Sequence, residues 1–323
     1  MHSETQPKMM NRRQALFLGG GTLLLLAVGS DAEVALAAKP VLRLGLITDV
    51  HYADADTKGT RYYRESLGKM REAVTHLNGE KVDVAVALGD LIDTPNPPDV
   101  AKETGFLKII TGEFGKLNAP RHFVLGNHCV SGLTKAQFLA GCGQSRSYYS
   151  FDKNGVHCVV LDACFRADGT AYAPGEFKWT DTEIPAVERD WLEKDLQSAT
   201  GKVLVFVHQR LDAPKNSDYL IHSAPAVRTI LEKSGKVLAV FQGHSHQNEL
   251  QVINTIPYLT MAAMIEGSGP ENSGYSVLGV HPDNSLTLTG FRKHAAHPFA
   301  ARKDSADKSA RVKEKRESSG RRG

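Results

Sequence analysis

Runs of apolar, β-branched residues recur along this chain, and segments with helical periodicity separate them. Five of the runs have the length and the continuous apolar character of buried strands: 41–49, 82–90, 121–127, 202–208 and 236–244. In the clearest helical segment, apolar residues at three- and four-residue steps line one face: Leu67, Met70, Val74 and Leu77. Buried strands that alternate with helices predict an α/β fold, with a largely parallel sheet covered on both faces.

Further elements follow the same pattern. We expect helices near 100–116, 186–197 and 226–233, strands near 148–152 and 156–163, and shorter strands from there up to Arg292. The sequence contains no internal repeat. Its 323 residues suffice for a substantial core. We assign residues 38–299 to one domain.

The formal net charge of +3 is spread unevenly. Residues 301–323 hold nine Lys/Arg against four Asp/Glu, whereas the first 37 residues hold three of each, so the body between them is slightly acidic. A protein that binds nucleic acid would carry its basic charge on the folded body, and we therefore expect no nucleic-acid partner. The polar, aperiodic segment 300–323 is predicted to be a disordered basic tail.

The first 37 residues have the composition of an export signal. Paired Arg12 and Arg13 precede an apolar run from Ala15 to Val28, and Ala-Leu-Ala at 35–37 supplies a cleavage site. The run is shorter than the roughly 20 residues of a membrane span. We interpret it as a twin-arginine signal, the alternative being a general secretory signal that contains Arg-Arg. The chain is then exported, to the periplasm or beyond the cell, with the export machinery as a partner and no stable membrane association.

Each of the five buried strands ends in polar residues of types that bind metals. In chain order these are Asp49 and His51, Asp90, Asn127 and His128, His208, and His244 and His246. One such ending is weak evidence, because an Asp after a strand is usually a turn residue and a lone His is usually a satisfied polar group. In open α/β sheets, however, sites form outside the carboxyl ends of the strands, so five endings in order indicate one shared site.

The residue types indicate the chemistry of that site. Two carboxylates, four imidazoles and an amide oxygen form a mixed N/O ligand set, which suits Mn, Fe, Zn or Co better than Ca or Mg. Seven ligands are too many for one ion with an open position, but they suit two ions that share a bridging carboxylate. Two such ions acidify a water and clamp a phosphoryl oxygen during hydrolysis of a phosphate ester or anhydride.

The motifs that carry these residues resemble those of the calcineurin-like metallophosphoesterases. They are D-x-H at 49–51, G-D-x-x-D at 89–93, G-N-H at 126–128, the strand-final His208, and G-H-x-H at 243–246. The resemblance covers nearly the whole body of the chain. It implies an α/β, two-sheet sandwich flanked by helices, with a dinuclear metal centre and a small phosphorylated substrate.

The resemblance also implies roles for single residues. One ion would be held by Asp49, His51, Asp90 and His246, and the other by Asn127, His208 and His244 together with Asp90 as the bridge. His128 would not be a ligand; it would face the substrate, stabilise developing charge and protonate the leaving oxygen.

Two segments, 52–78 and 264–293, look like the manganese-dependent ADP-ribose/CDP-alcohol diphosphatase branch of that family. This likeness implies a nucleotide-like diphosphate substrate, with Arg61 either binding a phosphate or remaining a solvated arginine at a helix start. Arg210, two residues after His208, either binds a second phosphate or pairs with an acidic residue on the surface. A non-catalytic binding protein on the same fold is the alternative from another class, although none of the expected ligands is missing.

Cys129 departs from the family pattern, since much of the superfamily has Asp or Glu after G-N-H. A neutral thiol does little to hold a protonated imidazole, so we expect His128 to titrate lower than it would beside a carboxylate. Alternatively, Cys129 packs as a small buried residue or pairs with Cys142. The chain has four cysteines, and disulfides are permitted in an exported protein.

Overall fold

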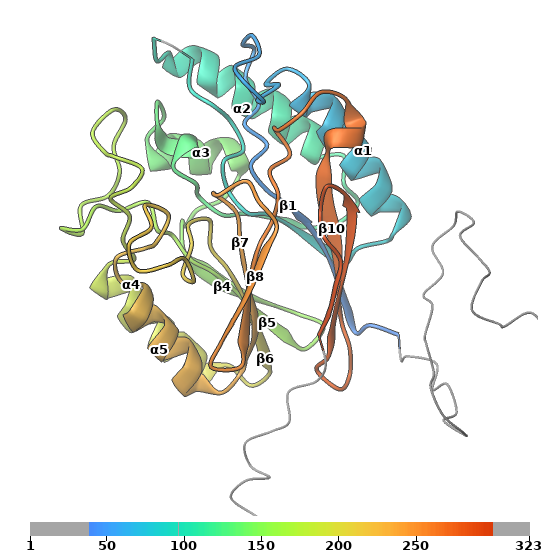
Figure 1. Ribbon diagram of the computed structural model, residues 1–323, viewed down its shortest axis with the longest axis vertical. Helices are drawn as coiled ribbons and strands as arrows, with labels where there is room; N and C mark the ends of the chain where they lie inside the picture. The colour runs from blue at the N-terminus through green and yellow to red at the C-terminus, as the bar shows by residue number, and fades with distance from the viewer. Residues whose placement is uncertain (1–38, 96, 300–323) are drawn as a thin grey trace, which may run out of the picture. The chain divides into compact units, whose positions relative to one another are not determined.

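The computed structural model describes residues 39–95 and 97–299 of the chain. Within these ranges, a pair of six-stranded sheets face each other, with helices on the outer face of each (Figure 1). The predicted export signal (1–37) and basic tail (300–323) lie outside the described residues, so those boundaries stay predictions. Among the described residues, no helix has both the length and the apolar character that a membrane crossing requires.

The first sheet has the strand order β12-β11-β10-β1-β2-β3. Its strands are β1 (Leu42–Ile47), β2 (Val84–Ala87), β3 (Arg121–Phe123), β10 (Gly274–Val280), β11 (Leu286–Arg292) and β12 (His297–Phe299). Strands β1, β2 and β3 are parallel, whereas β10, β11 and β12 add to the other side of β1 in antiparallel pairs. The three parallel strands therefore end in neighbouring loops at one edge of the sheet.

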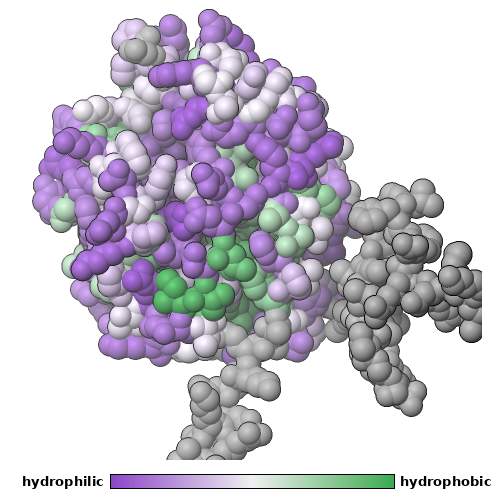
Figure 2. Space-filling view, in the orientation of Figure 1, coloured by the Kyte–Doolittle hydropathy of each residue, from purple (hydrophilic) through white to green (hydrophobic). Residues whose placement is uncertain are grey.

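The second sheet has the order β4-β5-β6-β7-β9-β8. Its strands are β4 (Tyr149–Lys153), β5 (Val156–Val160), β6 (Lys202–Phe206), β7 (Val237–Gln242), β8 (Glu249–Ile253) and β9 (Ile256–Thr260). The four central strands are parallel, and β4 and β8 are antiparallel edges. Leu250 and Val252 of β8 are exposed, and Figure 2 shows a hydrophobic patch on the otherwise mostly hydrophilic face around this strand.

Within the described ranges, five α-helices cover the outer faces of the two sheets. Helices α1 (Ser66–Gly79), α2 (Val100–Phe114) and α3 (Lys135–Cys142) pack on the first sheet, and α4 (Ala186–Ser198) and α5 (Ala224–Ser234) pack on the second (Figure 1). Side-chain caps mark the starts of two of these helices: the Asp99 carboxylate accepts hydrogen bonds from the first turn of α2, and Thr134 and Gln137 form a capping box on α3.

Strand residues alternate between two cores. In β1, Leu44 and Leu46 lie in the core between the sheets, together with Cys158 and Phe206 of the second sheet, whereas Ile47 lies in the core beneath the helices. The two-sheet sandwich flanked by helices is thus confirmed. The expectation of a single largely parallel sheet was wrong in number, because the strands form two sheets; both faces of each sheet are covered, by helices on the outside and by the other sheet on the inside. Helix α3 and strand β12 were not predicted.

One buried carboxyl group gives the fold a pH dependence. Glu103 of α2 is fully buried, its Oε2 atom accepts a 3.3 Å hydrogen bond from Thr94, and its Oε1 atom has no partner. Burial raises the pKa of Glu103 to about 7. The folded state therefore retains a proton that the unfolded state releases, and stability falls as the pH rises from the ordinary glutamate pKa to about 7.

We expect Glu103→Gln to remove this loss, because the amide is neutral at every pH. The variant should exceed the parent in unfolding free energy by about 2 kcal/mol at about pH 8 and by much less at about pH 4. Urea denaturation at the two pH values measures the difference. An equal effect of the substitution at both would contradict a titrating Glu103.

Candidate metal centre

Five loops from the two sheets meet at one point. Strands β1, β2 and β3 of the first sheet and β6 and β7 of the second each deliver at least one of the residues predicted from the sequence. The imidazole Nε2 of His51 lies 3.6 Å from Asp49 Oδ1 and 3.6 Å from Asp90 Oδ2. The Nε2 atom of His208 lies 3.0 Å from the same oxygen of Asp90. Residues that are far apart in the sequence thus form one cluster across both sheets.

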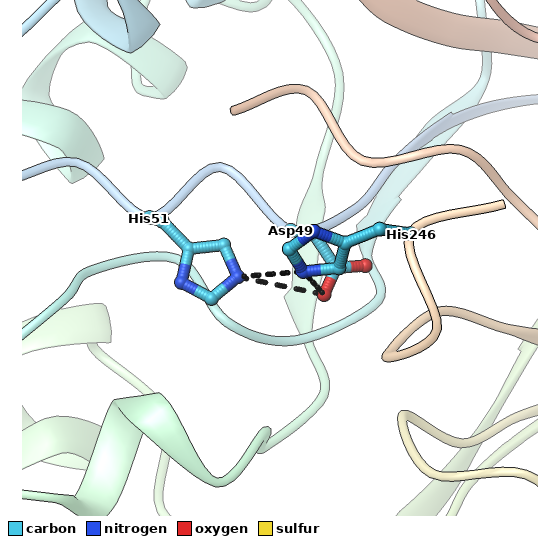
Figure 3. A group of neighbouring side chains, drawn as sticks. All are labelled: Asp49, His51 and His246. Carbon is cyan, nitrogen blue, oxygen red and sulfur yellow. Dashed lines mark hydrogen bonds and ion pairs between the residues drawn. The ribbon is translucent and has the colours of Figure 1, made fainter. Parts of the chain in front are cut away.

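One half of the cluster consists of Asp49, His51 and His246 (Figure 3). The Nε2 atoms of the two histidines face each other at 3.2 Å, and that of His246 lies 3.4 Å from Asp49 Oδ1. Three potential ligand atoms therefore point at a common centre. This arrangement fits a cation, because the imidazole nitrogens and the carboxylate can all donate electron pairs to it.

The other half consists of Asp90, His208 and His244. Asn127 adjoins it in the chain, because the backbone N–H of the next residue, His128, donates to Asp90 Oδ1. Two of its polar atoms, Asn127 Oδ1 and His244 Nε2, are buried and have no hydrogen-bond partner, and His208 Nε2 faces the Asp90 carboxylate at 3.0 Å. Buried polar atoms in native proteins are normally satisfied, and an unsatisfied one costs about 1–3 kcal/mol. The residues present therefore fit a metal ion, which would supply the partner that these buried atoms lack.

The charges of the cluster support the same conclusion. Burial alone would lower the pKa of His208 and of His246, but the carboxylates of Asp49 and Asp90 raise the pKa of His208 to about 9, and those of Asp49 and Glu266 raise the pKa of His246 to about 9. Burial and the neighbouring charge of His208 lower the pKa of His244 to about 3, which keeps its nitrogen unprotonated. Positive charge thus stabilises the buried carboxylates, and bound cations would supply that charge in place of the protons on the histidines.

Groups behind the histidines fix their orientation. The Nδ1 atom of His51 lies 3.2 Å from Asp93, that of His246 lies 2.7 Å from Glu266, and that of His208 donates to the carbonyl oxygen of Leu88 at 2.8 Å. With Nδ1 engaged in this way, each Nε2 atom points into the cluster.

The sequence reasoning missed both carboxylates. Asp93 could have been found, because it is the second Asp of the G-D-x-x-D motif. Glu266 lies in a loop with no spacing that ties it to His246, so the sequence offered no signal for its role.

The backbone of the cluster has an unusual conformation. Five of the predicted ligands have a positive φ: Asp49 (50°), His51 (47°), Asp90 (47°), His244 (73°) and His246 (60°). Residues other than glycine rarely adopt this left-handed region, although Asp and His do so more often than most. Such strain concentrates at functional sites, where the surrounding fold imposes it.

His128 lies beside the cluster and is oriented by a carboxylate. Its Nδ1 atom lies 3.0 Å from Asp93 Oδ1, its backbone N–H donates to Asp90 Oδ1 at 2.8 Å, and 27% of its side chain is exposed. Asp93 therefore holds the Nδ1 atoms of both His128 and His51. These three residues also form a third group of potential metal ligands, but we interpret their contacts as orienting the two histidines.

The premise of the expectation for His128, that no carboxylate supports its imidazole once position 129 is Cys, was wrong. Cys129 is fully buried in the core beneath α1, α2 and α3, and burial raises the pKa of its thiol to about 12. Burial would lower the pKa of His128, but Asp90 and Asp93 raise it above its ordinary value. The carboxylate thus comes from Asp93 rather than from position 129. Cys129 packs as a small apolar residue, and all four cysteines are free, so it does not pair with Cys142.

The two arginines considered as phosphate contacts lie in different surroundings. The Nη1 atom of Arg61 is 3.7 Å from Asp93, and its Nε atom is 3.8 Å from Glu266, so Arg61 lies at the edge of the cluster. The side chain of Arg210 is only 4% exposed and pairs with Asp212 at 3.0 Å and Glu249 at 2.6 Å. Of the two roles considered for Arg210, phosphate binding and pairing with an acidic residue, the structure shows the pairing.

The sandwich and its convergent Asp, His and Asn side chains define a metal-dependent phosphoesterase. The chain belongs to the calcineurin-like phosphoesterase family, whose sequence model matches residues 42–248. This range contains all five motifs.

Individual proteins agree with this assignment. A manganese-dependent ADP-ribose/CDP-alcohol diphosphatase of Oryza sativa is 27% identical over 84% of this chain and 98% of its own length. The protein of the same name from Arabidopsis thaliana is 24% identical over 79% of this chain and 95% of its own. Among solved structures, a dimetal phosphatase from Danio rerio has the same fold, with a TM-score of 0.72 and 21% identity over 81% of this chain and all of that one.

Proposed function

We propose that this phosphoesterase hydrolyses the diphosphate linkage of a small nucleotide-like molecule such as ADP-ribose or a CDP-alcohol. The observation that carries the hydrolytic site is the pair of buried, unpaired ligand atoms on Asn127 and His244 beside the contact between His208 and Asp90. The relatives support the choice of substrate, because the two plant proteins that match most of this chain carry the name of a diphosphatase for these compounds.

The residues present fit two metal ions. Asp49, His51 and His246 would hold one and Asn127, His208 and His244 the other, with Asp90 between them. When bound, such ions polarise the phosphoryl group and acidify a water molecule. The mixed N/O ligand set suits manganese, iron or zinc.

Other residues contribute what the ions do not. His128, held at Nδ1 by Asp93, carries a proton that it can give to the leaving oxygen of the diphosphate. Arg61 lies at the edge of the cluster, where its guanidinium can bind the phosphate that is not attacked. The same guanidinium is near Asp93 and Glu266, which hold it toward the site.

The test is a substrate panel on residues 38–323, loaded separately with Mn, Fe, Zn and Mg. The panel compares ADP-ribose, CDP-choline, an aryl phosphate monoester and a bis-aryl diester, with Asp90→Asn as the blank. We expect the two diphosphates to have the highest kcat/KM with Mn. A preference for the simple esters would replace this proposal with a general phosphatase or phosphodiesterase.

The comparison with Asp90→Asn also tests the alternative that the chain is a non-catalytic binding protein. A non-catalytic binding protein would show no difference between the parent and Asp90→Asn with any metal. Binding of Mn by the parent, measured by calorimetry, would then separate an inactive metal protein from a chain that never took up the ion.

We further propose that residues 1–37 direct export and are removed after Ala37. The support is the Arg12-Arg13 pair, the short apolar run and the Ala-Leu-Ala sequence. Replacing Arg12 and Arg13 by Lys should keep the protein in the cytoplasm if the twin-arginine route is used. Continued export of that variant would point to the general secretory route, and a mature protein that retains its first 37 residues would contradict cleavage.

A further inference from the structure

A cavity adjoins the candidate metal centre. Its volume is about 480 Å³, and its lining includes Asn127, His128 and Ser131 on one side and the segment 175–180 on the other. Asn127 is a predicted metal ligand and His128 the proposed proton donor, so on the proposed function the phosphoryl group would lie beside this cavity. The rest of the substrate molecule could therefore occupy this cavity.

Two exposed aromatic side chains lie beside this cavity and the centre. The rings of Trp179 and Tyr219 are 5.3 Å apart, and they lie 5.5 Å and 5.4 Å, respectively, from the ring of His244. Trp179 is 40% exposed and Tyr219 is 36% exposed. Among residues 39–95 and 97–299, no other Phe, Tyr or Trp is as exposed as these two. The two most exposed aromatic side chains of the described residues thus lie beside the candidate metal centre.

The segment that carries Trp179 is anchored on both sides. Tyr172 stacks on Phe177 with ring centroids 3.9 Å apart, and its hydroxyl donates to the carbonyl oxygen of Asp181 at 2.8 Å. The hydroxyl of Thr182 donates to the carbonyl oxygen of Ala163 at 2.6 Å. Since these contacts already fix the segment, a ligand that stacks on Trp179 would spend little free energy on ordering it.

We propose that Trp179 and Tyr219 form an aromatic platform that binds the planar base of a nucleotide substrate. The inference rests on the proposed function, because it places the base next to the phosphoryl group held at the metal centre. Bases stack on aromatic side chains through faces that every base possesses, so the platform selects for the presence of a base and tolerates adenine and cytosine alike. Lys178, in the lining between Phe177 and Trp179, adds a positive charge near the phosphates.

The first test needs no hydrolysis. The chain has two tryptophans, Trp179 and Trp191, and Trp191 lies on α4 against Tyr148 at 5.1 Å. In a Trp191→Phe variant, Trp179 is the single tryptophan reporter. Adenosine monophosphate should quench its fluorescence in a saturable way, and ribose 5-phosphate, which lacks the base, should not. Equal quenching by both compounds, or by neither, would overturn the proposal.

The second test measures affinity and selectivity. By calorimetry, Trp179→Ala should bind adenosine monophosphate about 5- to 100-fold more weakly than the parent, and Trp179→Phe should regain most of the loss. The ratio of kcat/KM for ADP-ribose to that for inorganic pyrophosphate should fall about 10-fold in Trp179→Ala. Trp191→Ala is the matched control and should change neither quantity.

The two proposals can fail separately. Quenching by adenosine monophosphate without hydrolysis of any diphosphate would support the platform and reject the proposed reaction. Hydrolysis of ADP-ribose with unchanged binding in Trp179→Ala would keep the reaction and reject the platform.

Discussion

Replacing Asp93 with Asn is expected to lower kcat/KM about 1,000-fold, even with saturating Mn. The reason is that one carboxylate serves two histidines: its oxygens lie 3.2 Å from Nδ1 of His51 and 3.0 Å from Nδ1 of His128. The amide of Asn keeps the shape but loses the charge and one acceptor. His51 is then free to rotate away from the centre, and His128 loses the group that holds its proton and its orientation.

The matched control is Glu266→Gln, because Glu266 orients a predicted ligand, His246, but does not contact His128. This variant should bind Mn about 10- to 100-fold more weakly and recover most of its activity when Mn is added. Steady-state kinetics across a Mn titration, with metal content measured in parallel, separates the two variants. If excess Mn rescues Asp93→Asn as fully as Glu266→Gln, Asp93 acts only through His51.

Gly126→Ala is expected to reduce activity at least about 100-fold, because a displacement of about 1 Å in a catalytic group has an effect of that size. A methyl group at position 126 would overlap the carboxylate and the backbone nitrogen of Asp90. Asp90 is the predicted bridging residue and is buried, so it has no room to retreat. The overlap should also lower the unfolding free energy by about 1–3 kcal/mol. Activity and thermal unfolding of the purified variant measure the two effects.

Gly112→Ala provides a control of the same chemistry. Gly112 lies in α2, is exposed, and has open space where the methyl group would be placed. The substitution should raise the unfolding free energy by about 0.5–1 kcal/mol, since Ala favours the helix, and leave activity unchanged. A fully active Gly126→Ala variant would show that Asp90 can move without harm to the centre.

Much of the fold followed from the sequence because its strands are buried on both sides. Continuous apolar runs such as 202–208 and 236–244 predicted strands, which the structure has at 202–206 and 237–242, so the predicted ends lie two residues too far along the chain. The same property hid the second sheet: a run that is apolar throughout does not tell whether a helix or another sheet covers each face. Only the family resemblance separated these cases. Helix α3 escaped notice because only Phe138 among its eight residues is buried, which leaves no periodic stripe to detect.

The positions that meet at the site were also predictable, but their supporting contacts were not. Strand ends mark where Asp49, Asp90 and His208 must lie, because parallel strands share one edge. The direction of a side chain after a strand depends on the turn, and the turn at 126–130 sends Cys129 into the core and His128 outward. Glu266 reaches its histidine through tertiary packing alone. Whether the seven predicted residues bind two ions stays a prediction that metal analysis can decide.

The position of the candidate centre between the two sheets gives bound ions a second consequence. Asp49, His51, Asp90 and Asn127 follow strands of one sheet, whereas His208, His244 and His246 follow strands of the other. Ions held by both groups would cross-link the halves of the sandwich, joining residues such as His51 and His246 that are 195 positions apart. The bound ions would then stabilise the packing of one sheet on the other, and their removal would lower the unfolding free energy of the domain as well as abolish the reaction.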